Sequence, residues 1–288
     1  MSYILAKLKS KEVREKILFE RLCEPLLVNF MAAFAWVFGD FRWKVAFDLI
    51  VRQHNAYAIL KAADRASAIG VKGISILEFG VAAGAGLMNM ALIAQKVEQI
   101  TGVKIKVYGF DTGQGMPPAV DYRDHPDLYQ QGDFPMDFDR LSRSLPSNCQ
   151  LFIGDTKENI TKFLAQLTPE FPVGYVVVDV DYYWSSKIVM EVFKDIPAKY
   201  LPLTSVYLDD SWVEDNNTFA GELLAVEEFN REMPLRKIEH NPFLVHKRIV
   251  RRPMWIRQLY TLHVFDHPTK FDVNYRKAKR VHDNPYLT

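Results

Sequence analysis

Apolar residues recur at helical spacing through the first quarter of the chain. Helices are predicted for residues 12–22, 24–38 and 42–70. Gly39 and Asp40 separate the second helix from the third, which ends at Gly70. We therefore expect a helical region over residues 1–70, and we expect its residues 30–43 to form an oligomer interface or a roof over a site.

Further along, short apolar runs alternate with amphipathic segments. The runs predict strands at residues 74–80, 105–111, 149–155, 174–181 and 205–210. The segments between and after them predict helices at residues 86–102, 156–167, 185–196 and 221–233. This alternation predicts an α/β domain over residues 71–265, with a mostly parallel sheet and helices on both faces. One more strand is expected at residues 256–265, followed by a polar, basic tail over 266–288.

Composition narrows the class of protein. With 288 residues, 49% of them hydrophobic, the chain can bury one large core or two modest ones. A net charge of +1 gives no electrostatic argument for binding nucleic acid. The two cysteines, Cys23 and Cys149, are too few for a disulfide framework or a cysteine zinc site. The N-terminus lacks a secretory signal pattern, and the apolar stretch 25–38 is shorter than the roughly 20 residues of a membrane span. These features predict a cytoplasmic protein without a membrane span.

Ligands of open α/β sheets bind outside the carboxyl ends of the strands, so the residues at those ends are the candidates for function. The first predicted strand runs into an E-x-G-x-x-x-G-x-G loop formed by Glu78, Gly80, Gly84 and Gly86. Glycines there permit a tight turn and a close approach of a ligand to the backbone. A simple strand-to-helix turn would also explain the glycines, but it would not explain Glu78. The dinucleotide pattern G-x-G-x-x-G is broken at Asn89.

The next two strands each end in an aspartate. Asp111 can accept both hydroxyls of a ribose, or it can be the turn residue before Gly113. Asp155 can face the amino group of a base, but it also begins a capping-box pattern, D-T-K-E. For Asp155 the two roles are equally consistent with the sequence, and one residue can serve both.

The fourth and fifth strands carry four aspartates at their ends. Asp179 and Asp181 follow the fourth strand and point to the same side, because side chains repeat every two residues. Asp209 and Asp210 follow the fifth strand. If the two strands are neighbours, the carboxylates converge and raise each other's pKa values unless a cation lies among them. A hard divalent ion, Mg²⁺ by preference, is the simplest resolution. The alternative is that each aspartate caps a helix or loop.

Five segments of the chain, taken in sequence order, resemble those of a known protein family. They read ILEFGVAAGAG, VYGFDT, GDT, VVVDVDYYWSSK and VYLDDSW. Over residues 74–229 the chain resembles the class I S-adenosylmethionine-dependent methyltransferases, most closely the macrocin-type, metal-dependent sugar O-methyltransferases. That group carries an I-D-x-D-L-Y-x-S-T segment, which residues 179–187 match with substitutions, and an aspartate pair after the next strand.

The resemblance implies a fold and a set of roles. The fold is a doubly wound, mostly parallel seven-stranded sheet of the Rossmann-like methyltransferase type with an N-terminal helical extension. The glycine loop with Glu78 would hold the methionine part of S-adenosylmethionine, Asp111 the ribose, and Asp155 would lie near the adenine. Asp179, Asp209 and Asp210 would ligate Mg²⁺, with Asp181 as a further ligand or the base, and Asp179 and Asp181 are the two candidate catalytic residues.

Two features depart from the family pattern. Tyr183 and Trp184 replace smaller or charged residues, and the segment after Asp111 is long. Its residues 117–140 form either a solvated surface loop or a lid over the acceptor, and His125 within it is a weaker candidate base.

The expected activity is methylation of a hydroxyl on a small molecule by a homo-oligomeric enzyme, with sugar, polyketide and phenol acceptors all open. A nucleotide-sugar glycosyltransferase would explain Asp179 and Asp181 but not the glycine loop. A short-chain dehydrogenase would use Tyr183 and Lys187 but leave the acidic cluster unexplained. A methyltransferase-like subunit without catalysis is the third alternative.

Overall fold

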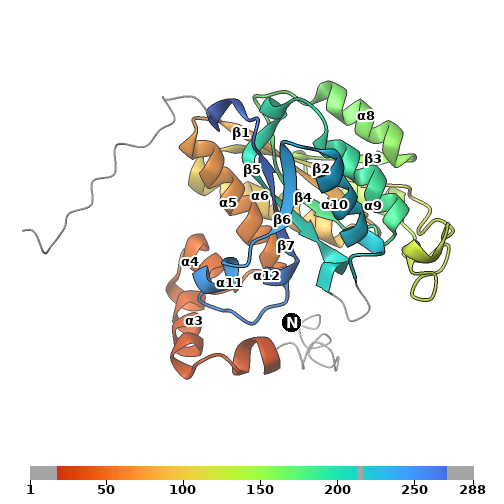
Figure 1. Cartoon of the computed structure of the whole chain (residues 1–288). Helices are drawn as coiled ribbons and strands as arrows, with labels where there is room; N and C mark the ends of the chain where they lie inside the picture. Colours follow the sequence, from red (N-terminus) through yellow and green to blue (C-terminus); the bar gives the residue numbers. More distant parts are fainter. Residues whose placement is uncertain (1–17, 213–216, 271–288) are drawn as a thin grey trace, which may run out of the picture.

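Seven strands form one mixed sheet at the centre of the molecule (Figure 1). The computed structural model describes residues 18–212 and 217–270. The strands are β1 (Gly73–Phe79), β2 (Lys104–Asp111), β3 (Cys149–Ile153), β4 (Val173–Val178), β5 (Tyr200–Leu208), β6 (Arg236–His240) and β7 (Leu259–Val264). Their order is β3-β2-β1-β4-β5-β7-β6, and β7 pairs antiparallel with both β5 and β6.

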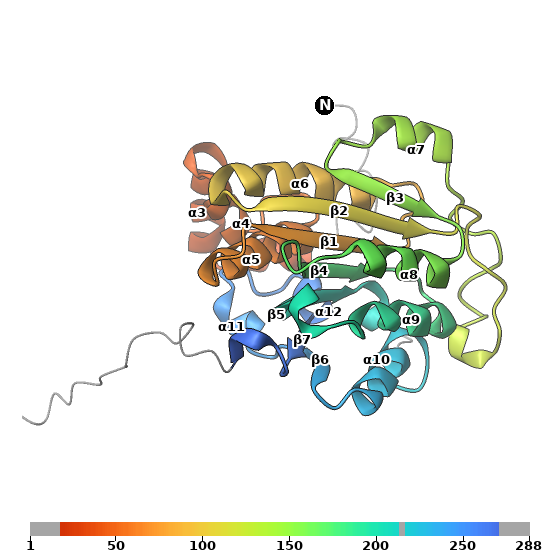
Figure 2. The same ribbon diagram turned by 90° about the horizontal axis from the view of Figure 1, so that it is seen from above.

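Helices cover both faces of this sheet. They are α3 (Leu26–Phe38), α4 (Phe41–Ala46), α5 (Gln53–Ala68), α6 (Ala85–Thr101), α7 (Phe138–Ser144), α8 (Thr156–Gln166), α9 (Tyr183–Val189), α10 (Gly221–Glu232), α11 (Leu244–Lys247) and α12 (Trp255–Gln258). Helices α5 and α6 lie on one face, and α8, α9 and α10 lie on the other (Figure 2). The predicted doubly wound, mostly parallel seven-stranded sheet with an N-terminal helical extension is confirmed.

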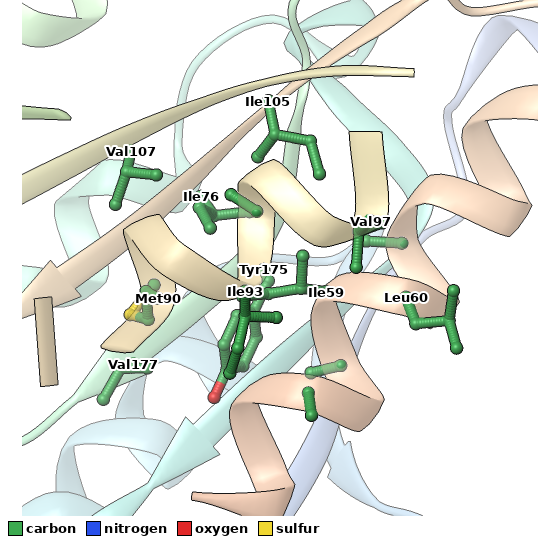
Figure 3. Close-up of a cluster of buried hydrophobic side chains, with 14 of the residues drawn as sticks. Ile59, Leu60, Ile76, Met90, Ile93, Val97, Ile105, Val107, Tyr175 and Val177 are labelled. Carbon is green, nitrogen blue, oxygen red and sulfur yellow. The ribbon is translucent and has the colours of Figure 1, made fainter. Parts of the chain in front are cut away.

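The core between the sheet and helices α5 and α6 is mainly aliphatic. Ile59 from α5 and Ile93 from α6 pack with Ile76 and Val177 from the central strands (Figure 3). All seven residues of β1 are buried, and all but Ser75 and Glu78 are apolar, as expected for a strand that is covered on both faces.

The opposite face of the sheet holds an aromatic core. The rings of Phe79, Phe110 and Phe152 stack across three neighbouring strands, with centroids 4.5 and 5.0 Å apart. Phe163 of α8 packs edge-on against Phe110, at 5.5 Å. Such offset and edge-to-face pairs are the favoured arrangements of aromatic rings. The two cores fix the carboxyl ends of β1, β2 and β4 in space.

The N-terminal helices are bound to the C-terminal part of the chain. Asp48, in the turn after α4, forms a buried ion pair with Arg248 at 2.5 Å. The indole N–H of Trp255 donates to the same carboxylate at 3.2 Å. Glu24 accepts hydrogen bonds from the backbone N–H groups of Arg251 and Arg252.

Several predicted boundaries were wrong. The predicted helix 42–70 is two helices, because Asp48 and Arg52 between them have φ values of 53° and 55°. These left-handed conformations interrupt a right-handed helix. The predicted strand 256–265 begins with the short helix α12, and the predicted helix 185–196 is α9 followed by the 3₁₀ turn η3 (Met190–Phe193).

Strand β6 had no predicted counterpart. Its sequence is Arg-Lys-Ile-Glu-His, and Ile238 is its one apolar residue. It lies at the edge of the sheet, where a strand can carry polar side chains such as the exposed Glu239.

Parts of two predictions lie outside the described residues: the start of the helix at 12–22 and the tail beyond residue 270. The end of that helix is the π-helical turn η1 (Leu18–Leu22). Within residues 18–212 and 217–270, no helix is both long and apolar enough to cross a membrane.

Candidate functional site

A cavity of about 430 Å³ opens at the carboxyl ends of the parallel strands. This volume is within the range of roughly 300–1,000 Å³ that is usual for small-molecule sites. Phe79, Gly80, Phe110 and Asp111 line one part of it, from β1 and β2 and the loops that follow them. The other part is lined by the four aspartates that follow β4 and β5: Asp179, Asp181, Asp209 and Asp210.

The glycine loop after β1 contributes Gly80 and Ala82 to the wall of the cavity. Gly80 has φ of 86°, and a Cβ there would overlap the carbonyl oxygen of Asp179, so the position requires glycine. Asp111 holds the loop in place: one carboxylate oxygen accepts from the backbone N–H groups of Val81 and Ala82, at 2.8 and 2.9 Å. Gly80 and Asp111 line the cavity, whereas Gly84 lies at the start of α6 under Leu141.

Glu78 lies beneath the loop and is not among the residues that line the cavity. Its carboxyl group packs against Gly86, where a Cβ would overlap Oε1. Burial raises the pKa of Glu78 to about 8, with the charge of Arg52 opposing the rise and those of Asp111 and Asp209 adding to it. Within the described residues its Oε2 atom has no hydrogen-bond partner. Glu78 is therefore a buried, mostly protonated acid at neutral pH.

Asp155 caps a helix. Its Oδ1 atom accepts from the backbone N–H of Glu158 at 2.8 Å, at the N-terminus of α8. The next residue, Thr156, lines the cavity, while Asp155 does not. The predicted capping contact of Asp155 is therefore present, and its contact with the base of a cofactor stays a prediction.

The four aspartates form one electrostatic cluster. Burial raises the pKa of Asp179 well above its usual range, and Asp209 and Asp181 raise it further. Burial and the adjacent Asp181 raise the pKa of Asp210 to about 8. Asp181 has a φ of 56°, a left-handed conformation that is uncommon for a residue with a side chain. The predicted convergence of these carboxylates is present, because β4 and β5 are neighbours.

Two residues of the cluster were missed in the sequence. Glu222, in the first turn of α10, is buried, and its Oε2 atom accepts from the backbone N–H of Asp210 at 3.2 Å. Burial and Asp210 raise its pKa well above the usual range. Glu222 shares the buried face of α10 with Ala225, Val226 and Phe229, so a glutamate at an apolar position was the available signal.

Tyr129 is the second residue of the cluster that was not predicted from the sequence. It comes from the long segment 117–140, and its hydroxyl lies 3.3 Å from Oδ1 of Asp210, to which it donates. It lines the cavity together with Pro117 and Phe134 of the same segment. Nothing distinguishes Tyr129 in the sequence from the other aromatic residues of this segment.

The segment 117–140 is docked on α9. The buried carboxylate of Asp124 accepts from the backbone N–H groups of Val120 and Trp184, at 2.8 and 3.1 Å. The Arg123 guanidinium lies over the rings of Tyr183 and Trp184, 4.5 and 4.8 Å from their centroids. The two aromatic residues that depart from the family pattern are therefore the docking surface for this segment.

The remaining candidates lie apart from the cavity. Tyr183 and Lys187 both contact one carboxylate oxygen of Glu228, at 2.8 and 2.5 Å, and neither lines the cavity. This arrangement is a helix-to-helix contact and gives no support to a dehydrogenase dyad. His125 packs against Gly221 at the start of α10, outside the cavity lining.

The chemistry of the carboxylate cluster suits a hard cation, since carboxylate oxygens are preferred by Mg²⁺ and the mutual repulsion is relieved by positive charge. In the part of the chain that the structure describes, however, no three His, Cys, Asp or Glu side chains are placed to hold one metal ion. The donors are present, and their side chains would have to reorient to share an ion.

Comparisons with known proteins give only weak likenesses. No protein-family model and no curated protein matches the chain. Among solved structures, the calicheamicin methyltransferase CalS11 is 21% identical, covers 81% of this chain and 91% of its own, and has a TM-score of 0.47. MnmC2 from Aquifex aeolicus is 13% identical over 73% of this chain and 57% of its own, with a TM-score of 0.35.

The plantazolicin methyltransferase BpumL, in complex with a triazolic desmethylPZN analog and SAH, is 9% identical and has a TM-score of 0.33. It covers 90% of this chain and 93% of its own. Likenesses at this level do not establish a shared activity, so function has to be inferred from the site.

Proposed function

We propose that the chain is an S-adenosylmethionine-dependent O-methyltransferase that acts on a hydroxyl group of a small molecule. The observation that carries this proposal is the composition of one cavity. Residues of the glycine loop and Asp111 line one part of it, and four clustered aspartates line the other. The first part suits the nucleoside and methionine of the cofactor, and the second suits activation of an acceptor hydroxyl. The resemblance of the motifs to class I methyltransferases supports the same activity.

S-adenosylmethionine supplies, when bound, a methyl group on a positively charged sulfur. In the transfer, a bond forms between the acceptor oxygen and the methyl carbon, the carbon–sulfur bond breaks with its electron pair going to sulfur, and the hydroxyl proton leaves. The chain has to hold the acceptor oxygen in line with the breaking bond and take up that proton. Asp181 lines the cavity, and burial raises its pKa, which makes its carboxylate a stronger base than an exposed aspartate.

The proposal includes a dependence of the activity on Mg²⁺. Asp179, Asp209 and Asp210 would hold the ion, and Asp181 would remain as the base. Such an ion would orient the acceptor hydroxyls and lower their pKa. The cluster of carboxylates with raised pKa values supports this assignment, because an ion would remove the repulsion among them.

Calorimetric titration tests the activity class. We expect binding of S-adenosylmethionine and S-adenosylhomocysteine, and none of NADPH or a nucleotide sugar, each with and without Mg²⁺. Binding of the nucleotide sugar with Mg²⁺, and of neither S-adenosyl compound, would indicate a glycosyltransferase instead. Binding of both S-adenosyl compounds with no methylation of any hydroxyl acceptor would favour a non-catalytic subunit.

The metal assignment is tested by Asp209→Asn, with Mn²⁺ as a spectroscopic probe in electron paramagnetic resonance. Loss of one carboxylate ligand should weaken Mn²⁺ binding at least tenfold and leave affinity for S-adenosylhomocysteine nearly unchanged. Asp127→Asn, at an exposed position of the segment 117–140, is the matched control. If the wild-type protein binds no Mn²⁺, the metal assignment is wrong while the cofactor assignment stands.

A further inference from the structure

Asp210 is held at two points by residues from two other elements. The Tyr129 hydroxyl, from the segment 117–140, donates to its Oδ1 atom at 3.3 Å. Oε2 of the buried Glu222, from α10, accepts from its backbone N–H at 3.2 Å. Asp210 itself lies in the 3₁₀ turn η5 (Asp209–Trp212), which directly follows β5. One contact therefore fixes the backbone of Asp210, and the other fixes its carboxylate.

The segment 117–140 reaches Asp210 from a fixed base. The backbone N–H of Met116 donates to the carbonyl oxygen of Asp133 at 2.8 Å, and the N–H of Gly132 donates to the carbonyl oxygen of Met116 at 2.9 Å. A Cβ at Gly115 would overlap the same carbonyl oxygen of Asp133, so this close approach requires glycine. Gly115 and Met116 line the cavity. The segment is therefore a loop whose base is closed at the cavity wall.

The middle of the segment contacts the start of α10, the helix that carries Glu222. A Cβ at Gly221 would lie 3.1 Å from Nε2 of His125 and 3.8 Å from the carbonyl oxygen of Asp181. Asp181 is the central residue of a tight turn, in which the backbone N–H of Tyr182 donates to the carbonyl oxygen of Val180 at 2.5 Å. The segment, the start of α10 and the loop after β4 therefore meet beside the aspartate cluster.

The contact between Tyr129 and Asp210 has the form of an interaction that orients a ligand of a cation. A phenol keeps its proton at neutral pH, so the Tyr129 hydroxyl is the donor. A carboxylate has about four acceptor sites, so Asp210 can accept this hydrogen bond and still contact an ion. Loss of a side chain that orients a metal-binding group typically weakens metal binding by roughly 10–100-fold.

We propose that Tyr129 is a positioning residue for Asp210, and that through this contact a divalent cation at the aspartate cluster and the segment 117–140 stabilise each other. The proposal rests on the proposed function, because Asp210 is one of the metal ligands assigned there. Coupling between two binding events is reciprocal. If the docked Tyr129 strengthens cation binding by a given factor, the cation favours the docked segment by the same factor. The cation thereby stabilises the wall that Pro117, Tyr129 and Phe134 give the cavity.

Tyr129→Phe tests this coupling, because it removes the hydroxyl and keeps the ring that packs edge-on against Tyr182. We expect Mn²⁺ binding, followed by electron paramagnetic resonance, to be about tenfold weaker in the variant, with the affinity for S-adenosylhomocysteine unchanged. Saturating Mn²⁺ should slow limited proteolysis within residues 117–140 about tenfold in wild type and have little effect in Tyr129→Phe. Tyr122→Phe is the matched control, since Tyr122 lies in the same segment and is 74% exposed, and it should behave as wild type.

The outcomes separate this coupling from the other assignments. An unchanged Mn²⁺ affinity in Tyr129→Phe would mean that the hydroxyl only holds the segment in place, and tighter Mn²⁺ binding would mean that it competes with the ion. Either result would overturn the proposal, as would equal cleavage rates of wild type with and without Mn²⁺. If wild type binds no Mn²⁺, this proposal and the metal assignment are both wrong, and binding of S-adenosylhomocysteine leaves the cofactor assignment intact. If wild type binds Mn²⁺ as expected but neither S-adenosyl compound, the methyltransferase proposal is wrong and the role of Tyr129 stands.

Discussion

At the scale of single residues, Glu78 combines full burial with an ionisable group. Near pH 4.5, its ordinary pKa, the side chain begins to ionise in the unfolded chain, whereas the folded protein retains the proton up to about pH 8. The folded state therefore binds more protons over this interval, and the free energy of unfolding falls as the pH rises. Each pH unit of the interval costs up to about 1.4 kcal/mol.

Glu78→Gln should flatten this dependence, because glutamine has no proton to lose. We expect urea unfolding at pH 5 and pH 8 to show a smaller loss of stability in the variant than in wild type, with the remaining slope due to the other buried carboxyl groups. Glu239→Gln, on the exposed side of β6, is the control and should keep the wild-type slope. Equal slopes in wild type and Glu78→Gln would contradict the assignment of Glu78 as a buried, protonated acid.

The sequence predicted some site residues and not others for physical reasons. Asp179 and Asp209 were recognisable because a charge directly after a buried apolar strand has few explanations other than a site. The sequence could not decide whether Asp155 caps a helix or contacts the base of a ligand, because both roles use the same residue type. Tyr129 reaches the cluster only through the path of a long segment, and that path depends on contacts with α9 that no local pattern encodes.

At the scale of elements, the segment 117–140 and helix α9 form one unit. The carboxylate of Asp124 satisfies the backbone N–H of Trp184 at the start of α9 and the N–H of Val120 within the segment. One buried side chain thus caps a helix and fixes the segment that carries Tyr129 to the cavity.

Asp124→Ala should release this segment. Loss of a capping carboxylate costs roughly 0.5–2 kcal/mol of stability. We expect limited proteolysis to cleave within residues 117–140 much faster in the variant, with the core still folded by circular dichroism. Asp127→Ala, at an exposed position of the same segment, should be cleaved at the wild-type rate. A wild-type cleavage rate for Asp124→Ala would mean that other contacts hold the segment in place.

The boundaries of helices and strands could be predicted where the hydrophobic periodicity of the sequence was strong. The predictions were wrong where contacts with distant parts of the chain set the boundary. Strand β4 is a continuous apolar run, β1 is apolar except for Ser75 and Glu78, and both were predicted, whereas β6 has one apolar residue and is held by pairing with β7. The break between α4 and α5 is set by Asp48, whose partner Arg248 is 200 residues away. Local sequence carries no information about such a partner.

At the scale of the whole molecule, helix α3 exposes an apolar surface. Asn29 is its one polar residue, and of its side chains Ala32 and Ala35 are buried. Four aromatic side chains of α3, namely Phe30, Phe34, Trp36 and Phe38, are each more than half exposed. A helix that is apolar on all sides is normally buried. Full burial of one aromatic residue removes roughly 150–250 Å² from water, so these four with the adjacent leucines approach the roughly 800 Å² per partner of a stable interface.

We propose that α3 pairs with α3 of a second copy of the chain about a two-fold axis. Light scattering after size-exclusion chromatography should show a dimer for wild type and a monomer for Phe30→Asp, since a charge at the interface would be desolvated. Phe138→Asp on α7, a distant exposed position, should remain dimeric. A monomeric wild-type protein would contradict this pairing.

The ion pair between Asp48 and Arg248 also constrains how the protein folds as it is synthesised. The chain is made from its N-terminus, and Asp48 leaves the ribosome long before Arg248 has been translated. Until then, the N-terminal helices lack Arg248, Trp255 and the backbone groups that bind Glu24. Glu24 and Asp48, which lie on either side of helices α3 and α4, therefore lack these partners for most of the time that translation takes, at about 5–20 residues per second. During that interval α3 is the surface that a chaperone would have to protect.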